Sequence, residues 1–259
     1  MKSKVELFGL ELPEIKPGDN LAAMISESAV QLVNGLEDGD ILIVTSKVVS
    51  KADGLLVDLR NVKPSRRAVS IAKKAGGDPR YIQVVLDNSD QVLLTLPIYD
   101  FARKGLVDIG KFAEDSSVAY EVLKKSPTAL IVISGGQIYS DAGIDSSNHP
   151  EDLVSVPPKD PNMSAGELRA RISALTGRDV AVIVSDTEMW LSQGSIDFAR
   201  GASGIQVITK KFGRRDRYGK PKFGGVDFVA QELACAAALL MGQTDEGVAG
   251  GAGKRIQVC

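Results

Sequence analysis

Three short apolar runs constrain the fold most, because each has the length and composition of a buried β-strand. Their sequences are Asp-Ile-Leu-Ile-Val-Thr at 40–45, Ala-Leu-Ile-Val-Ile-Ser at 129–134 and Val-Ala-Val-Ile-Val-Ser at 180–185. Continuous apolar residues indicate strands that are covered on both faces, as in sheets flanked by helices. We therefore predict an α/β fold, mixed with α+β features, in which helices flank buried strands.

Apolar spacing and capping residues predict the helices around these strands. The expected helices cover Asp19–Val33 with Asp19 as N-cap, Ser65–Ala75, Asp78–Leu86, Ser164–Leu175 and Asp227–Met241, with a further strand at Gln91–Thr95. Ser164 and Glu167 form a capping box, and the last helix is apolar nearly all round, which is typical of a central helix. Prolines at 157, 158 and 161 predict a linker between two interleaved subdomains, 1–160 and 161–259.

Composition excludes several classes of function. The net charge of −2 gives no field that would recruit nucleic acid or an anionic membrane. No run reaches the roughly 18–20 apolar residues of a membrane span, and Met1–Leu10 lacks the apolar core of a secretory signal. Cys235 and Cys259 form no disulfide framework, so we expect a cytoplasmic protein. With His149 as the single histidine, the remaining chemistry is that of carboxylates, hydroxyls and lysines.

Polar residues lie beyond each apolar run. Ser46-Lys47 follow the first run, 141–148 lies beyond the second and Asp186-Thr187 follow the third. Ligands of open α/β sheets bind beyond the carboxyl ends of strands, so the three clusters are expected to converge and to hold divalent metal around Asp145 and Asp186. Taken singly, each cluster also fits a structural alternative, because Asp-Gly and Asp-Ser form turns and Asp-Thr caps helices.

Six stretches in order and spacing resemble the coenzyme F420 gamma-glutamyl ligase family. They are Leu-Pro-Glu-Ile at 12–15, Thr-Ser-Lys-Val-Val-Ser-Lys-Ala-Asp-Gly at 45–54, Ala-Gly-Ile-Asp-Ser-Ser-Asn at 142–148, Ser-Asp-Thr at 185–187, the stretch 213–219, and Met-Gly-Gln-Thr-Asp-Glu-Gly at 241–247. Together they span most of the chain. The resemblance implies a GTP-dependent ligase that phosphorylates an acceptor carboxylate, after which the amine of L-glutamate displaces phosphate.

The resemblance also implies the site residues and the assembly. The metal ligands would be Asp145, Asp186, Thr187 and Gln243, all oxygen donors that suit Mg²⁺ or Mn²⁺ at two sites, with K⁺ as a further candidate ion. Guanine nucleotide would contact Leu12, Pro13, Glu14, Ile15, Ser46, Lys47, Lys51, Asn148, Met241, Gly242, Gly247 and Val248. Residues 1–160 would hold nucleotide and metal, residues 161–259 would complete the site, and the protein would be a homodimer.

The chain departs from the family after Asp186-Thr187. The family continues with glycine and arginines, whereas this chain has Glu-Met-Trp-Leu-Ser-Gln-Gly at 188–194, and Glu188 is an alternative metal ligand. The segment 97–125 is polar and charged, as an insertion would be, and Val-Ala-Gly-Gly-Ala-Gly-Lys-Arg at 248–255 replaces an expected hydrophobic strand. That tail only imitates a phosphate loop, because just five residues follow Lys254 and we expect no helix to begin there.

Two questions stay open from the sequence. The basic run from Lys210 to Lys220 is either a solvated loop or lies near an acidic substrate, with Arg214, Arg215 and Tyr218 as the contacts. The acceptor is either a coenzyme F420 precursor or another molecule such as folate, and the rival to both is a GTP-binding protein that has lost turnover.

Overall fold

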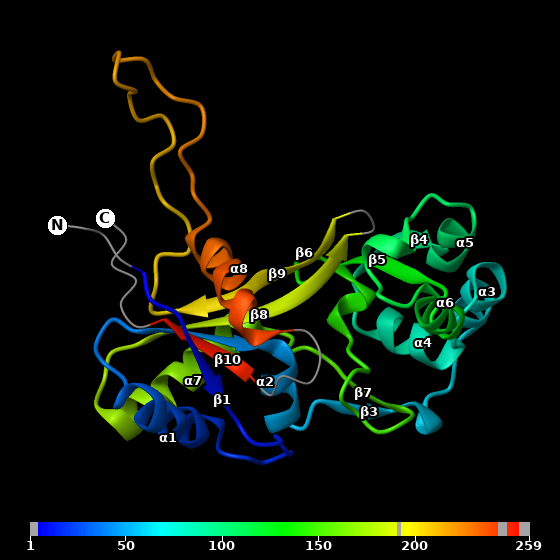
Figure 1. The fold of residues 1–259 in the computed structure, drawn as a ribbon, viewed down its shortest axis with the longest axis horizontal. Helices are drawn as coiled ribbons and strands as arrows, with labels where there is room; N and C mark the ends of the chain where they lie inside the picture. Colours follow the sequence, from blue (N-terminus) through cyan, green and yellow to red (C-terminus); the bar gives the residue numbers. More distant parts are fainter. Residues whose placement is uncertain (1–4, 191–192, 243–247, 254–259) are drawn as a thin grey trace. The chain divides into compact units, whose positions relative to one another are not determined.

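The computed structural model describes residues 5–190, 193–242 and 248–253 (Figure 1). The chain divides into two compact units that alternate along the sequence. Unit 1 comprises Met1–Gly54, Asp160–Asp186 and Asp197–Cys259, and unit 2 comprises Leu55–Lys159 and Thr187–Ile196. One boundary between the units, at Lys159/Asp160, adjoins the linker prolines. The segment up to Gly54, however, belongs to the same unit as the C-terminal residues.

A five-stranded sheet forms the centre of unit 1, in the order β1-β10-β2-β8-β9. Its strands are β1 (Phe8–Glu11), β2 (Ile41–Thr45), β8 (Ala181–Trp190), β9 (Gly194–Ser203) and β10 (Val248–Gly253). Strands β2 and β8 are parallel, with Thr45 opposite Ser185, whereas β10 is antiparallel to both β1 and β2. Two of the predicted strands therefore lie side by side, and β8 continues to Trp190 beyond the end of β2.

Helices cover both faces of this sheet, which confirms the prediction for the first and third apolar runs. On one face, α1 (Leu21–Val33) and α7 (Pro161–Thr176) pack against the even-numbered side chains of β2 and β8, such as Leu42 and Val182. On the other face, α8 (Val229–Met241) packs against the odd-numbered ones, such as Ile43 and Ile183. The short helix α2 (Ser46–Ala52) follows β2 directly.

Unit 2 contains two small antiparallel sheets. One has the order β4-β5-β6, and the other pairs β3 with β7. The elements are β3 (Leu56–Asp58), η1 (Leu59–Asn61), α3 (Arg66–Ala75), α4 (Pro79–Asp87), β4 (Gln91–Leu96), α5 (Ile98–Arg103), η2 (Ile109–Lys111), α6 (Ser116–Lys125), β5 (Ala129–Ser134), β6 (Gln137–Ser140), η3 (Asp141–Gly143) and β7 (Leu153–Ser155). Helices α3 and α4 begin after the predicted caps Ser65 and Asp78. The polar segment 97–125 folds as α5, η2 and α6 around Ala102, Val107 and Ile109.

The prediction for the second apolar run was wrong in two respects. Strand β5 lies in the sheet of unit 2, so the three polar clusters do not follow three strands of one sheet. Only Leu130 and Val132 of β5 are fully buried, because the strand is covered on one face. Gly135 and Gly136 adopt positive φ and turn the chain into β6, so the segment 141–148 follows β6 rather than β5.

Helix starts also differ from the prediction. Asn20, not Asp19, caps α1 by accepting a hydrogen bond from Ala23 N, while Asp19 accepts one from Lys16 N. Helix α7 begins at Pro161 rather than Ser164, because Asp160 accepts a hydrogen bond from Met163 N and proline suits the first helical position. The capping box at Ser164 is therefore interior to the helix.

The C-terminal expectations were corrected as well. The glycine-rich residues Val248–Gly253 form a strand in the middle of the sheet, although glycine disfavours strands, because β1 and β2 hydrogen-bond to both of its edges. Helix α8 is not wholly buried, because Leu239 is 83% exposed and Leu240 is 40% exposed. No helix among the described residues is long and apolar enough to cross a membrane.

Substitution of Gly201 tests the packing of β9 on α7. A Cβ at Gly201 would lie 2.2 Å from the carbonyl carbon of Pro161, so Gly201→Ala should lower the free energy of unfolding by at least about 2 kcal/mol. The matched control is Gly166→Ala inside α7, where the nearest atom is 3.8 Å away and alanine should stabilise by about 0.5–1 kcal/mol. Chemical denaturation measures both, and equal stabilities of the two variants would contradict this packing.

Candidate functional site

The parallel pairing of β2 with β8 brings two predicted site residues into contact in unit 1. The register places Thr45 opposite Ser185. The next residues are Ser46, which begins α2, and Asp186, which lies within β8. The Ser46 hydroxyl donates a hydrogen bond of 2.9 Å to Asp186 Oδ1. Ser46 is buried, and Asp186 is half-buried at the edge of the sheet. Thr187, the next residue of β8, already belongs to unit 2. A hydroxyl that donates to a carboxylate fixes its orientation, as partners of metal-binding carboxylates commonly do.

A further carboxylate, which the sequence did not single out, contacts Ser185, the residue before Asp186. Asp197 on β9 is 2% exposed, and the buried Ser185 hydroxyl donates to its Oδ2 over 3.4 Å. Asp197 lies in no recognised motif, so only the pairing of β8 with β9 reveals it.

The predicted nucleotide-binding residues of unit 1 meet around α2. Lys47 and Lys51 are four residues apart on α2 and so lie on one side of it. Lys51 is buried and forms an ion pair of 2.9 Å with Glu14 Oε1, whose side chain is exposed. The structure thus joins two stretches, 12–15 and 45–54. Within the first stretch Pro13 is exposed, Leu12 packs against the core, and Ile15 is buried in it.

Asp145 lies in unit 2, in the loop after η3. Its backbone N–H and C=O pair with Ser155, and its Oδ1 accepts a hydrogen bond of 2.6 Å from Ser147 N. Asp141, Ala142 and Asn148 have positive φ, which costs free energy for residues other than glycine. The loop is therefore held in an unusual backbone conformation by several fixed partners, and Asn148 is exposed on it.

Unit 2 also holds two acids with fixed hydrogen-bond partners, Glu188, which the sequence offered as an alternative metal ligand, and Asp141. Glu188 is buried and accepts hydrogen bonds from both N and Oγ of Ser140. Asp141 Oδ1 accepts one of 2.8 Å from Leu130 N. Burial raises the pKa of Asp141 from 3.8 to about 7, and the charge of Glu188 acts in the same direction against the Leu130 hydrogen bond. Burial also raises the pKa of Tyr81 well above 10.

Other predicted residues fall elsewhere or outside the described residues. Met241 is buried under the sheet of unit 1 and Gly242 ends α8, whereas Gln243 and Gly247 lie outside the described ranges. Val248 begins β10, opposite Glu11 of β1. Arg214, Arg215 and Tyr218 lie on an exposed hairpin, residues 205–228, which we call the arm.

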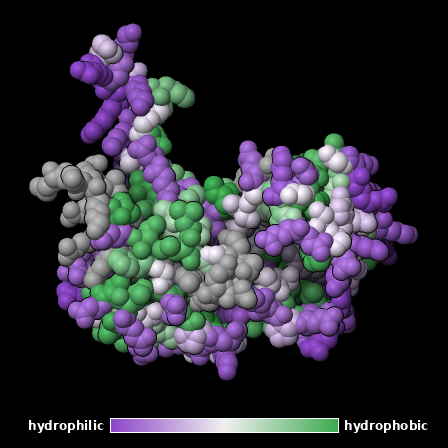
Figure 2. Space-filling view, viewed as in Figure 1, coloured by the Kyte–Doolittle hydropathy of each residue, from purple (hydrophilic) through white to green (hydrophobic). Residues whose placement is uncertain are grey.

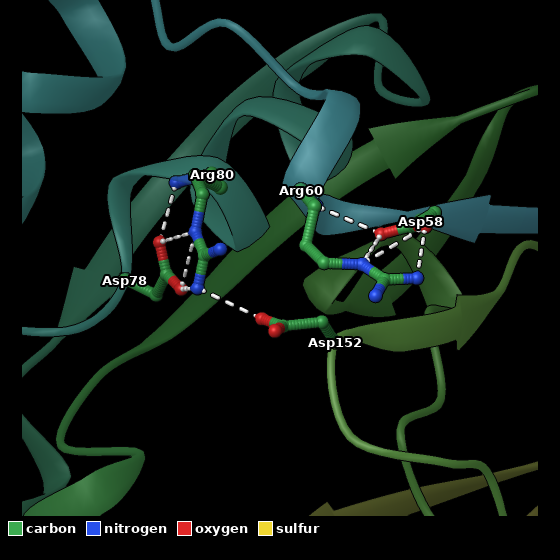
Figure 3. Close-up of polar contacts among 5 residues, drawn as sticks. All are labelled: Asp58, Arg60, Asp78, Arg80 and Asp152. Atoms are coloured by element: carbon green, nitrogen blue, oxygen red, sulfur yellow. Dashed lines mark hydrogen bonds and ion pairs between the residues drawn. The ribbon is translucent and has the colours of Figure 1, made fainter.

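The most conspicuous arginine–aspartate contacts of unit 2 are structural. Figure 3 shows Arg60 paired with Asp58, and Arg80 held between Asp78 and Asp152. Asp58 and Asp78 also accept hydrogen bonds from the backbone N–H groups of Arg60 and Arg80, as helix caps do. The Arg60 guanidinium lowers the pKa of Asp58 to about 2. These arginines support helix starts rather than a ligand.

The oxygen donors fit a hard divalent cation. Among the described residues no group of three or more His, Cys, Asp or Glu side chains gathers as a metal site would. Mg²⁺ does not require such a group, because one or two carboxylates, waters and substrate phosphates usually complete its shell. In unit 1 the Asp186 carboxylate and the Ser46 hydroxyl supply oxygen atoms of the kind such a cation binds, and Lys47 and Lys51 lie on the helix that begins at Ser46.

Comparison with known proteins gives the family. The sequence profile of the family described as F420-0:Gamma-glutamyl ligase matches residues 9–250, and the chain belongs to this family. It is 38% identical over 247 residues to the coenzyme F420:L-glutamate ligase of Archaeoglobus fulgidus, covering 95% of this chain and 85% of the relative. It is 36% identical over 235 residues to the enzyme of the same name from Methanopyrus kandleri, covering 90% and 80%.

The buried Asp141 predicts a pH dependence of stability. Because its pKa is higher in the folded than in the unfolded chain, its contribution is fully present below about pH 4 and is lost as pH rises through about 7. Asp141→Asn keeps an acceptor for Leu130 N but cannot ionise. The variant should gain stability over the wild type between pH 4 and 8, on the order of 4 kcal/mol, since each pKa unit is worth about 1.4 kcal/mol. Urea denaturation measures the free energy of unfolding of both proteins at each pH. If the difference between the wild type and Asp141→Asn does not change between pH 4 and 8, this assignment is contradicted.

Proposed function

We propose that this chain is a cytoplasmic, GTP-dependent ligase that joins L-glutamate to the carboxylate of a coenzyme F420 precursor. The family match over residues 9–250 supports the class of reaction. The single structural observation that supports a phosphate-dependent site is the contact between Ser46, directly after the carboxyl end of β2, and Asp186 on the parallel strand β8, with the lysines of α2 following Ser46.

In the proposed reaction the γ-phosphoryl group of GTP passes to a carboxylate oxygen of the acceptor, which yields GDP and an acyl phosphate. The amine of L-glutamate then attacks the acyl carbon, loses a proton and displaces inorganic phosphate, so an amide bond forms without a covalent enzyme intermediate. The protein has to position the reactants and spread negative charge. Lys47 and Lys51 are the proposed phosphate contacts, and Ser46 holds Asp186 in one orientation.

We propose Asp145, Asp186, Thr187 and Gln243 as ligands of two Mg²⁺ or Mn²⁺ ions, with K⁺ as a further ion. Bound cations would neutralise charge that develops on the transferring phosphoryl group. The chain's own contribution is to keep the donors fixed before the ions arrive. Hydrogen bonds from Ser46 to Asp186 and from Ser147 to Asp145 do this at the two carboxylates.

The proposed guanine-nucleotide contacts are 12–15, Ser46, Asn148, Met241, Gly242, Gly247 and Val248. The ion pair between Lys51 and Glu14 supports a common role for the first two stretches, because it brings 12–15 beside α2. The proposed acceptor contacts are Arg214, Arg215 and Tyr218, whose cations and phenol suit an anionic molecule with a planar ring.

Turnover tests the function directly. The chain mixed with GTP, manganese, L-glutamate and a coenzyme F420 precursor should release GDP and phosphate and give a product heavier by one glutamyl unit in mass spectrometry. Asp186→Asn should abolish turnover, because the amide keeps the shape but removes the charge that a hard cation needs. A glutamylated product from folate and none from the coenzyme F420 precursor would show that folate is the acceptor. Tight GTP binding without any product would favour a non-catalytic GTP-binding protein.

Unchanged manganese-dependent GTP binding in both Asp145→Asn and Asp186→Asn, measured by calorimetry, would contradict the metal assignment. Ser185→Ala is the matched control, because this buried hydroxyl contacts Asp197 and not Asp186 in the hydrogen bonds described above. It should leave the metal dependence of GTP binding intact.

The lysines of α2 give a second test of the nucleotide site. Lys47→Ala and Lys51→Ala should each weaken GTP binding about tenfold or more, since a charge-assisted hydrogen bond is worth about 1.5–3 kcal/mol. Glu14→Gln is the control for Lys51, because it weakens their ion pair and keeps the lysine. If Glu14→Gln lowers affinity as much as Lys51→Ala, the pair acts together. A loss below about 0.3 kcal/mol in both lysine variants would show that neither lysine binds the nucleotide phosphates.

A further inference from the structure

Arg200 on β9 is a buried charge to which the proposed reaction gives no role. It is 5% exposed, and its guanidinium carbon lies 5.2 Å from the ring centroid of Phe198. The cations of the arm, in contrast, lie in solvent, and its seven Lys and Arg outnumber its two Asp by five (Figure 2). A guanidinium buried as deeply as that of Arg200 requires negative charge or hydrogen-bond acceptors close to it. The sheet of unit 1 places a carboxylate there.

The side chains of Arg200 and Asp186 point to the same face of this sheet. Ala199 packs with Ile183 of β8 against α8, so Arg200, the next residue of β9, points to the opposite face. On β8 that opposite face is the one that Val184 turns toward α1 and α7. Asp186 is two residues further along β8 than Val184, and because alternate residues of a strand share a face, it points the same way.

Arg200 also lies at nearly the same level as Asp186 along the strands. Three residues separate Trp190, the end of β8, from Gly194, the start of β9, so these neighbouring strands form an antiparallel hairpin. Asp186 and Phe198 are each four residues from the turn end of their strand and are therefore opposite one another. Diagonal neighbours such as Asp186 and Arg200 lie about 7–8 Å apart. Because the guanidinium lies against Phe198, it is directed toward Asp186.

Asp186 therefore has a hydroxyl on one side and a cation on the other. Strand β8 lies between β2 and β9, and Ser46, directly after β2, donates its hydrogen bond to Asp186 Oδ1. Arg200 approaches from the β9 side. The other acid of β9, Asp197, contacts Ser185 and so lies on the α8 face, to which Arg200 does not point. The carboxylate that Arg200 faces within the sheet is thus Asp186.

The charges that unit 1 gathers around this point have a positive balance. They are three cations and two carboxylates, a balance of +1, namely Lys47, Lys51, Arg200, Glu14 and Asp186. A positive balance at a partly buried place attracts phosphate and disfavours a lone divalent cation. A carboxylate beside a fixed cation is therefore suited to a metal ion that arrives together with phosphate.

We propose that Arg200 is the counter-charge of Asp186 and makes the binding of divalent metal at Asp186 depend on nucleotide. This inference rests on the proposed function and deepens it, because it concerns how the proposed ligands of one site influence each other. With the guanidinium beside it, Asp186 attracts a lone metal ion weakly. The phosphates of GTP bring several negative charges, which the metal and Arg200 neutralise together. Metal and nucleotide then strengthen each other's binding by the same factor.

Two titrations with opposite expected signs test this role of Arg200. In the first, calorimetry measures Mn²⁺ binding to the full chain without nucleotide, and Arg200→Met should tighten it at least tenfold, because Asp186 loses its counter-charge. In the second, GTP binding is measured in EDTA without metal, and Arg200→Met should weaken it at least tenfold, because a cation that faces phosphate is lost. A variant that is merely less well packed would weaken both, so the two signs separate a positioning role from a structural one.

Further variants identify the charge and its partner. Arg200→Lys keeps the charge and should stay within about threefold of the wild type in both titrations. Arg200→Gln is a second neutral variant, for which the same two shifts are expected if Arg200→Met does not fold. Adding Asp186→Asn to either neutral variant should abolish the gained Mn²⁺ affinity, because the ion then lacks its carboxylate.

Arg169→Met is the matched control for the loss of an arginine from unit 1. Arg169 Nε donates to Val180 O, and its guanidinium pairs with Asp179. Val180 is six residues from Asp186 in sequence, which is about 20 Å along a strand at roughly 3.3 Å per residue. The control should therefore change neither the Mn²⁺ affinity nor the metal-free GTP affinity.

The outcomes separate this role from the proposed function. Unchanged Mn²⁺ and GTP affinities in folded Arg200→Met, or a loss of both, would overturn the role of Arg200, even if the wild type makes the glutamylated product. If the wild type makes no such product but the two affinities shift in opposite directions, the proposed function fails and the role of Arg200 stands. A wild-type chain that binds neither Mn²⁺ nor GTP would overturn both.

Discussion

The parallel pairing of β2 with β8 is the constraint on which the proposed nucleotide site of unit 1 depends. Because Thr45 lies opposite Ser185, Ser46 directly after β2 lies within hydrogen-bonding distance of Asp186 on β8. A shift of one residue would turn every side chain of a strand to the opposite face. The apolar alternation between the two helical layers therefore fixes this contact as firmly as it fixes the core.

Asp145, the second carboxylate of the proposed metal set, lies in a loop whose backbone conformation is energetically unfavourable. The loop that carries Asp145 is preceded by two residues with positive φ, and Asp141 is buried so that its ionisation is disfavoured near neutral pH. Unfavourable conformations and buried acids persist only where the surroundings enforce them, and they gather at functional sites. Here three sets of hydrogen bonds hold the loop in this conformation. Leu130 N donates to Asp141, Ser140 N donates to Glu188, and the backbone of Ser155 pairs with that of Asp145.

Charge is distributed unequally between the arm and the rest of the chain. An arm with a net charge of +5 and exposed aromatic rings projects from a body of opposite sign. The net charge of the whole chain is near zero, but the positive charges of the arm are separated from the negative charges of the remainder. The electrostatic potential around the arm is therefore positive, as the proposed binding of anions requires. The basic run is thus neither an unstructured loop nor a segment of the core. It is an ordered hairpin with its cations in solvent.

The sequence alone determined the family, the strands at the first and third apolar runs, and the helices capped by Ser65 and Asp78, because these follow from local patterns and motifs. Tertiary structure decided what depends on distant partners. It placed β5 in a separate sheet, made a strand of the glycine-rich Val248–Gly253 through hydrogen bonds to β1 and β2, and brought Glu14 to Lys51 and Glu188 to Ser140. Strand pairing and burial join residues far apart in sequence, and no local propensity encodes them.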